Sequence, residues 1–251
     1  MRKALLFIAW LALSLAGWSQ ETESVAKNQT DAQGLKQGYW EELVNRQWQK
    51  GNYENGLKEG VWRTYHPQGF ISEVVEYSKG KRNGLRLEID RRGYLVVEEY
   101  FKDDLLNGLY VNYMPGGRPQ VEQWYKNGKP WGLKKIYYEN GKPQEESYYV
   151  DGRRHGTSKW FYQNGKIAAE YIYANGDLDG IQKTYDKNGA LEKTETYKSG
   201  ILDGEYKEYY PDGKVKVSGT YINGEKEGKW TEYSPDGKEL KSTRFIKGKE
   251  K

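Results

Sequence analysis

The side chains that most often do chemistry are few and far apart in this sequence. The only histidines are His66 and His155, and cysteine is absent. A transition-metal site needs several nitrogen or sulfur ligands brought together, so we expect neither a metal site nor a cofactor. Each histidine lies at a turn signal, where we expect a solvated side chain. The sequence also lacks a nucleophile elbow and a phosphate-binding glycine loop.

Carboxylates and lysines recur at fixed intervals instead of forming an isolated catalytic pair. We expect the glutamates to form exposed cross-strand ion pairs with cations such as Arg86 and Lys134, and Glu145 to neutralise part of the lysine column. Such columns predict solvated stripes, and we therefore expect no enzyme activity. The two columns are Glu98, Glu122, Glu146 and Glu170, and Lys135, Lys159, Lys183 and Lys207.

Large aromatic side chains offer the better candidate for a contact site. Tyr138, Tyr148, Trp160 and Tyr162 lie at even-numbered positions of the sequence repeat described below, which we expect on the more polar face of the fold. Large aromatics on a charged face can mark a contact surface. They can also pack on one another across neighbouring strands. As a contact patch, these four would receive a protein surface or the flat face of a sugar ring.

The elements that position these side chains follow from glycines that recur every 24 residues. Repetition at a fixed period is typical of tandem-repeat proteins. Twenty-four residues hold two strands of about seven residues and two tight turns, so we expect an all-β fold. It would be an elongated, twisted or curled single-layer antiparallel sheet of tandem β-hairpins. The glycines that open the repeats, which we number as position 0, are Gly60, Gly84, Gly108, Gly132, Gly156, Gly180, Gly204 and Gly228.

The turn sequences predict how the two strands of each hairpin pair. A second glycine at position 9 ends a three-residue hairpin loop. Such a loop places position 5 opposite position 11. We also expect positions 5, 11 and 17, which are mostly aromatic or aliphatic, to share one face of the sheet. The predicted pairs are Tyr65 with Ile71, Phe161 with Ile167, and Tyr209 with Val215.

The N-terminal segments differ in composition from the repeat. Residues 1–19 carry two basic residues followed by an apolar run, typical of a secretory signal peptide. We expect cleavage after Ala16 or Ser19 and export to the periplasm, the cell envelope or the medium; an uncleaved anchor is the alternative. Polar residues 20–37 predict a flexible leader. The repeat array would then occupy 38–251, with about nine units and a degenerate first one.

The charge balance limits the classes of partner. The chain has 40 basic and 36 acidic residues and a formal net charge of +4. Nucleic-acid binding needs clustered positive charge, so we expect no nucleic-acid partner. Without a strongly basic face, we expect at most weak association with a membrane surface.

The repeat unit resembles a known family. Its glycine, tryptophan and tyrosine spacing resembles the MORN repeat in a bacterial 24-residue variant, over residues 38–251. Bacterial proteins of this kind are commonly labelled antitoxins, and the wider family is linked to protein–protein contact, dimerisation and phospholipid association. The resemblance implies a non-catalytic scaffold with a protein partner and an antitoxin- or immunity-like role as one option, although export would separate it from cytosolic antitoxins. The alternative is a glycan- or cell-wall-binding module that uses the surface aromatics. The residues that carry the resemblance include Gly60, Trp62, Tyr65 and Gly69, and Gly228, Trp230, Tyr233 and Gly237.

Overall fold

The computed structural model describes residues 26–251, which contain strands and no helix. The predicted signal peptide, residues 1–19, therefore lies outside the described residues. No helix long and apolar enough to span a membrane occurs between residues 26 and 251. The strands are β1 (Gln29–Thr30), β2 (Lys36–Val44), β3 (Gln47–Glu54), β4 (Leu57–Tyr65), β5 (Ile71–Ser78), β6 (Lys81–Ile89), β7 (Leu95–Lys102), β8 (Leu105–Tyr113), β9 (Pro119–Lys126), β10 (Lys129–Tyr137), β11 (Pro143–Val150), β12 (Arg153–Arg154), β13 (Gly156–Phe161), β14 (Ile167–Ala174), β15 (Asp177–Leu178), β16 (Gly180–Tyr185), β17 (Leu191–Lys198), β18 (Ile201–Tyr209), β19 (Val215–Ile222), β20 (Glu225–Tyr233), β21 (Glu239–Ile246) and β22 (Lys249–Glu250).

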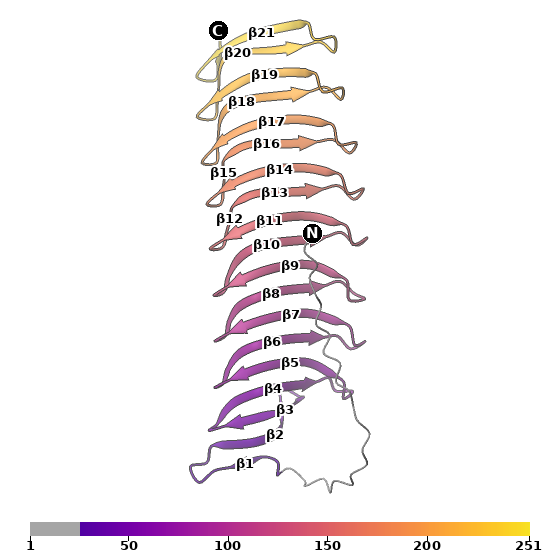
Figure 1. Ribbon diagram of the computed structural model, residues 1–251, viewed down its shortest axis with the longest axis vertical. Helices are drawn as coiled ribbons and strands as arrows, with labels where there is room; N and C mark the ends of the chain where they lie inside the picture. The colour runs from indigo at the N-terminus through magenta and orange to yellow at the C-terminus, as the bar shows by residue number, and fades with distance from the viewer. Residues whose placement is uncertain (1–25) are drawn as a thin grey trace, which may run out of the picture.

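These strands form one antiparallel sheet of hairpins stacked in chain order (Figure 1). The short strands β12 and β13 both pair with β11, and β15 and β16 both pair with β14, so each couple serves as one interrupted strand. The long strands thus make hairpins from β2–β3 to β20–β21. The predicted all-β sheet of tandem hairpins is confirmed, and the sheet is open. It begins within the predicted leader, since β1 and the start of β2 fall in the described part of residues 20–37.

Both kinds of turn depend on left-handed backbone. In the tight turn, two consecutive residues have positive φ, as at Asn127 (49°) and Gly128 (78°), which is the type I′ geometry of two-residue hairpin loops. Asp104 replaces the glycine of this turn in one repeat and keeps a φ of 68°. Its carboxylate accepts hydrogen bonds from the backbone N–H and Nε of Arg82, at 3.0 and 3.1 Å. These bonds hold a conformation that glycine would adopt without strain.

The predicted register holds beside the three-residue loop and fails beyond it. Tyr65 opposes Ile71, and the pairs Phe161–Ile167 and Tyr209–Val215 are also confirmed. The next pair joins position 4 to position 13, because position 12 is an extra residue in a β-bulge. A shift of one residue moves every following side chain to the opposite face. The expectation that positions 5, 11 and 17 share a face is therefore wrong.

The two faces can now be defined. Face A carries positions 0, 2, 4, 13, 15 and 17, and face B carries positions 1, 3, 5, 11, 14 and 16, as the register of β4 and β5 shows. Face A holds most of the buried apolar side chains. Trp62 and Trp230 are 3% and 6% exposed and lie against Gly51 and Gly219. A Cβ atom at Gly219 would come within 2.2 Å of the Trp230 ring, so this glycine makes room for the indole.

The bulge also changes the predicted ion pairs. Arg86 does not oppose Glu98 but Glu99, and its guanidinium binds Glu73, Glu88 and Glu99 at 2.8, 3.1 and 2.6 Å. Lys134 opposes Ser147 in place of a glutamate.

Glu145 lies away from the lysine column, on face A, where it accepts hydrogen bonds of 2.6 Å from Arg154 and from Ser147. The lysine column instead meets the glutamate column on face B. Within residues 26–251, two ion pairs join the columns, Lys135–Glu146 at 3.5 Å and Lys159–Glu170 at 3.2 Å.

Tyrosines at position 5 connect neighbouring hairpins on face B. The phenol of Tyr137 donates to Glu122 at 3.1 Å and that of Tyr185 to Glu170 at 2.9 Å. Burial, together with the adjacent carboxylate, raises the pKa of each phenol to about 12. These phenols therefore stay protonated and bonded at any ordinary pH.

Candidate interaction site

The edge of the sheet that carries the three-residue loops is held together by side chains at position 6. The hydroxyl of Tyr138 donates to the carbonyl of Phe161 at 2.6 Å, and the hydroxyl of Tyr162 donates to the carbonyl of Tyr185 at 2.7 Å. Each bond joins one loop to the end of a strand in the next repeat. Within the loop, the backbone N–H of Tyr138 donates to the carbonyl of Lys142 at 2.9 Å. This edge therefore has a preformed shape.

His66 belongs to the same set of contacts. Its Nε2 lies 3.0 Å from the carbonyl oxygen of Ile89, a contact that requires the proton on Nε2. The expectation of a solvated His66 is therefore wrong, because the ring performs the task that tyrosine performs in later repeats. His155 is exposed, as expected.

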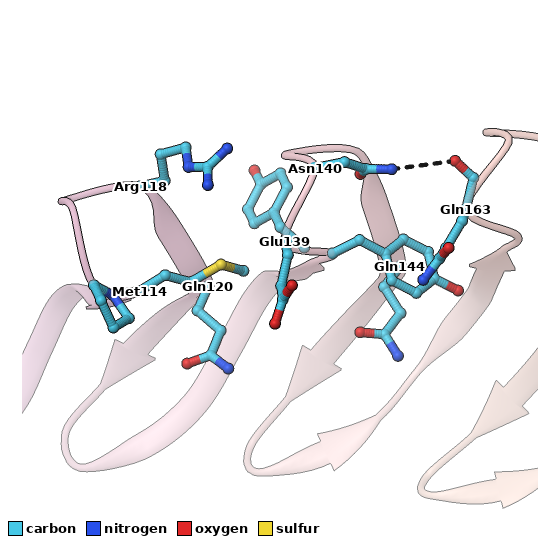
Figure 2. Close-up of a pocket in the computed structure, with 10 residues that line it drawn as sticks. Met114, Arg118, Gln120, Glu139, Asn140, Gln144 and Gln163 are labelled. Atoms are coloured by element: carbon cyan, nitrogen blue, oxygen red, sulfur yellow. Dashed lines mark hydrogen bonds between the residues drawn. The ribbon is translucent and has the colours of Figure 1, made fainter.

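A groove of about 840 Å³ opens along this edge (Figure 2). It lies between the loops that follow β8, β10 and β13. Its polar walls include two glutamine side chains at the bulge position of consecutive repeats, Gln120 and Gln144. The lining residues are Met114, Pro115, Arg118, Gln120, Tyr137, Tyr138, Glu139, Asn140, Gln144 and Gln163.

The polar groups of this groove have unused hydrogen-bonding capacity. Within residues 26–251, the side chains of Arg118, Gln120, Glu139, Gln144 and Gln163 make no hydrogen bond or ion pair, and all five are exposed. In Figure 2, Arg118, Glu139 and Gln163 reach the groove from three successive loops, and Gln120 and Gln144 reach it from the first residues of β9 and β11. Amides both donate and accept, while Arg118 and Glu139 add one charge of each sign. This set suits a ligand rich in hydrogen-bonding groups and of little net charge, such as an extended peptide or a sugar.

The titratable groups near this groove can be stated for residues 26–251. No group of three or more histidine, aspartate or glutamate side chains in residues 26–251 could hold a metal ion. Glu139 is the one carboxylate lining the groove.

The structure separates the four aromatic residues that the sequence offered as a candidate contact patch. Tyr138 lines the groove, and Tyr162 lines a second hollow of about 620 Å³ one repeat further along. Trp160 lies on face A, with its ring centre 5.0 Å from that of Tyr171. Tyr148 lies on face B, opposite Leu133. Two of the four thus share the loop edge, and the bulge places the other two on opposite faces.

Sequence reasoning missed Gln120 and Gln144. Their signal was present, since both follow the prolines at position 11, Pro119 and Pro143, in consecutive repeats. Their exposure depends on the bulge, which leaves position 12 without a cross-strand partner. The bulge itself was not predicted.

The groove lies beside hairpins whose sequence matches a known repeat. The family model described as MORN repeat variant matches residues 132–151, 154–175, 178–199 and 202–223. Four hairpins of this chain match the MORN repeat variant. The first of these MORN segments, 132–151, contains the loop between β10 and β11, which supplies Tyr138, and the start of β11, which supplies Gln144. The structure shows the same hairpin in the units outside the four matches.

Other comparisons are weak. No curated protein matches the chain. A structure of an S. aureus TarM mutant in complex with Fondaparinux, alpha-GlcNAc-glycerol and UDP is 17% identical, covers 49% of this chain and 19% of that chain, and has a TM-score of 0.20. A second TarM structure is 16% identical, covers 51% and 21% of the two chains, and also has a TM-score of 0.20. This chain spans about a fifth of the TarM chains, and the likeness carries no argument.

Proposed function

We propose that this chain is an exported, non-catalytic repeat scaffold that binds an extended segment of a protein partner in the Tyr138 groove. The observation that carries the proposal is the set of five polar side chains around the groove that bind nothing within the described chain. A peptide backbone offers alternating donors and acceptors, which amide side chains can satisfy.

The fixed loop edge supports this function. The hydroxyls of Tyr138 and Tyr162 tie successive loops together, so the groove needs little ordering when a partner binds. Preorganised sites gain affinity because they avoid this entropic cost. The loops are short and carry no insertion, whereas enzymes usually mount their chemistry on elaborated loops. An immunity-like role would make the partner an exported toxin.

Quantitative capture of partners tests the proposal. The purified chain, immobilised and presented with the secreted and envelope proteins of its source cell, should enrich a specific protein. The double variant Gln120→Ala, Gln144→Ala should lose that enrichment. The matched control is Gln68→Ala, an exposed loop glutamine in an earlier repeat. Equal enrichment by all three forms would contradict binding in the groove.

A glycan is the second candidate ligand, because an aromatic ring and several amides line the same groove. Tyr138 would lie against a sugar ring while Gln120 and Gln144 bind its hydroxyls. Titration calorimetry with soluble cell-wall and polysaccharide fragments distinguishes a glycan ligand from a protein ligand. Saturable glycan binding that is abolished by Gln144→Ala would favour a glycan- or cell-wall-binding module. If every fragment gives only the heat of dilution, a glycan ligand is excluded.

A further inference from the structure

A small hollow lies on face A beside the loop that joins β4 to β5, and it shares no lining residue with the Tyr138 groove. Its volume is about 270 Å³, just below the range of about 300–1,000 Å³ that is usual for pockets of drug-sized ligands. It therefore suits a small molecule or the end of one side chain. We call it the Ser72 hollow.

Ser72 gives the first indication of a ligand in this hollow. The residue occupies the bulge position of its repeat and is 7% exposed, and its Oγ is buried without a hydrogen-bond partner in the described chain. A buried hydroxyl that lacks a partner costs free energy, and most buried polar groups are therefore bonded. A ligand N–H in the hollow would supply the missing partner.

The charges at the hollow give the second indication. Glu73 opposes Glu88 directly across β5 and β6, an arrangement that is unfavourable for two like charges. Arg86 binds both of them and also Glu99, so one positive charge against three negative ones leaves a formal charge of −2. Lys58, another cation on face A, lies over a tryptophan ring and does not line the hollow. The hollow therefore favours a cation over an anion.

The unused oxygen atoms determine which kind of cation fits. Arg86 takes only one oxygen of each opposed glutamate, Oε1 of Glu73 at 2.8 Å and Oε2 of Glu88 at 3.1 Å. Within residues 26–251, Oε1 of Glu88 and the side-chain amide of Gln47 make no hydrogen bond. Together with Oγ of Ser72 they offer three acceptors from three strands, β3, β5 and β6. An ammonium group donates three hydrogen bonds.

Other cations match this set less well. The planar fork of a guanidinium prefers both oxygens of a single carboxylate, and Arg86 already occupies one oxygen of each glutamate. In the part of the chain from residue 26 to 251, no group of three or more histidine, aspartate or glutamate side chains could hold a metal ion. We propose that the Ser72 hollow binds a primary ammonium group, carried by a small free amine or by a lysine side chain of another protein. The proposal is independent of the ligand of the Tyr138 groove.

Titration with n-butylammonium chloride at constant ionic strength tests the proposal. The backbone amide resonances of Ser72 and Glu88 should shift and saturate. Tetramethylammonium has the charge without an N–H donor, n-butanol lacks the charge, and n-propylguanidinium has the wrong donor geometry, so each should bind at least about tenfold more weakly. Ser72→Ala and Glu88→Gln should each weaken n-butylammonium binding by about tenfold, which corresponds to one hydrogen bond to a charged group.

Two controls separate binding from folding. Glu232→Gln should leave the affinity unchanged, because Glu232 occupies the same repeat position as Glu88 but opposes Val217 and Lys241 instead of a glutamate. Ser72→Ala removes a hydroxyl that has no partner, so urea unfolding should show no loss of stability. Its loss of binding would then come from the missing oxygen atom.

A short acetylated peptide amide with one central lysine distinguishes the two sources of the ammonium group, with the norleucine peptide as its blank. Tighter binding of the lysine peptide than of n-butylammonium would assign the site to a protein lysine, and equal or weaker binding would assign it to a small free amine. The absence of saturable shifts with both amine probes would overturn the proposal. So would tetramethylammonium or n-propylguanidinium binding as tightly as n-butylammonium, or an affinity that neither variant changes. Partner capture in the Tyr138 groove is measured separately and can succeed in either case.

Discussion

The phenol of Tyr162 donates a hydrogen bond of 2.7 Å to the backbone carbonyl of Tyr185, one repeat further along the array. Tyr138 and Tyr210 make the same contact, at 2.6 and 2.7 Å. Consecutive hairpins are therefore joined by side chains as well as by the backbone ladder. In repeat arrays, such contacts between neighbours contribute directly to the stability of the whole.

Removing one of these hydroxyls should weaken the array measurably. We expect Tyr162→Phe to lower the free energy of unfolding by about 1 kcal/mol, the net worth of a typical hydrogen bond. Urea unfolding measures the change. Tyr94→Phe is the control, because this half-exposed loop tyrosine has no hydrogen bond from its hydroxyl within residues 26–251. Equal effects of the two substitutions would show that the Tyr162 contact adds nothing.

Gly219 should tolerate no side chain. A Cβ atom there would lie 2.2 Å from the ring of Trp230, and overpacking of this kind costs about 1–3 kcal/mol. Thermal or urea unfolding of Gly219→Ala should show this loss, while Ser218→Ala on face B should change little. In a Trp230→Leu background, the cost of Gly219→Ala should shrink. An unchanged cost would mean that the indole is not its source.

Arg86 should stabilise the fold by neutralising the three glutamates that surround it. Its side chain is 20% exposed and contacts three glutamates, so Arg86→Met leaves mutually repelling charges in a partly buried place. We expect a loss of about 2–3 kcal/mol in unfolding free energy near neutral pH.

Arg92→Met provides the comparison for Arg86→Met. Arg92 binds Asp90 at 3.0 Å, but its side chain is 64% exposed, and exposed pairs contribute about 0–1 kcal/mol. If Arg86→Met lowers the unfolding free energy no more than Arg92→Met does, burial does not strengthen the Arg86 ion pairs.

Alkaline pH should destabilise the fold through Tyr137 and Tyr185. Their pKa values are raised from 10.0 to about 12 by burial and by the neighbouring carboxylates. Because the folded pKa exceeds the unfolded one, their contribution is complete below pH about 10 and is lost as the pH rises through about 12. Urea unfolding across this interval, with tyrosinate absorbance recorded in parallel, measures both effects.

The double variant Tyr137→Phe, Tyr185→Phe isolates these two phenols. It should show a smaller loss of stability between pH about 10 and about 12 than the wild type does. Identical pH profiles would assign the alkaline effect to other groups.

Much of the fold could be predicted from local sequence. The period between Gly132 and Gly156, and the glycine that ends each loop, determine hairpins because tight turns need left-handed backbone at fixed places. The pair Phe161–Ile167 lies next to its loop and follows directly. The candidate site was harder to predict. Tyr138 was found from its size, but Gln120 and Gln144 were missed because their place at the groove depends on the bulge, which was not predicted.

The sequence by itself determined the hairpin, its turns and the pairing beside each loop, since these depend on backbone conformations that only a few residues adopt. Only the tertiary structure decided which face each side chain occupies. A single extra residue at position 12 of each repeat sends Trp160 and Tyr148 to opposite faces and brings the lysine and glutamate columns together. The physical reason is the two-residue period of a strand, in which one inserted residue reverses every side chain that follows.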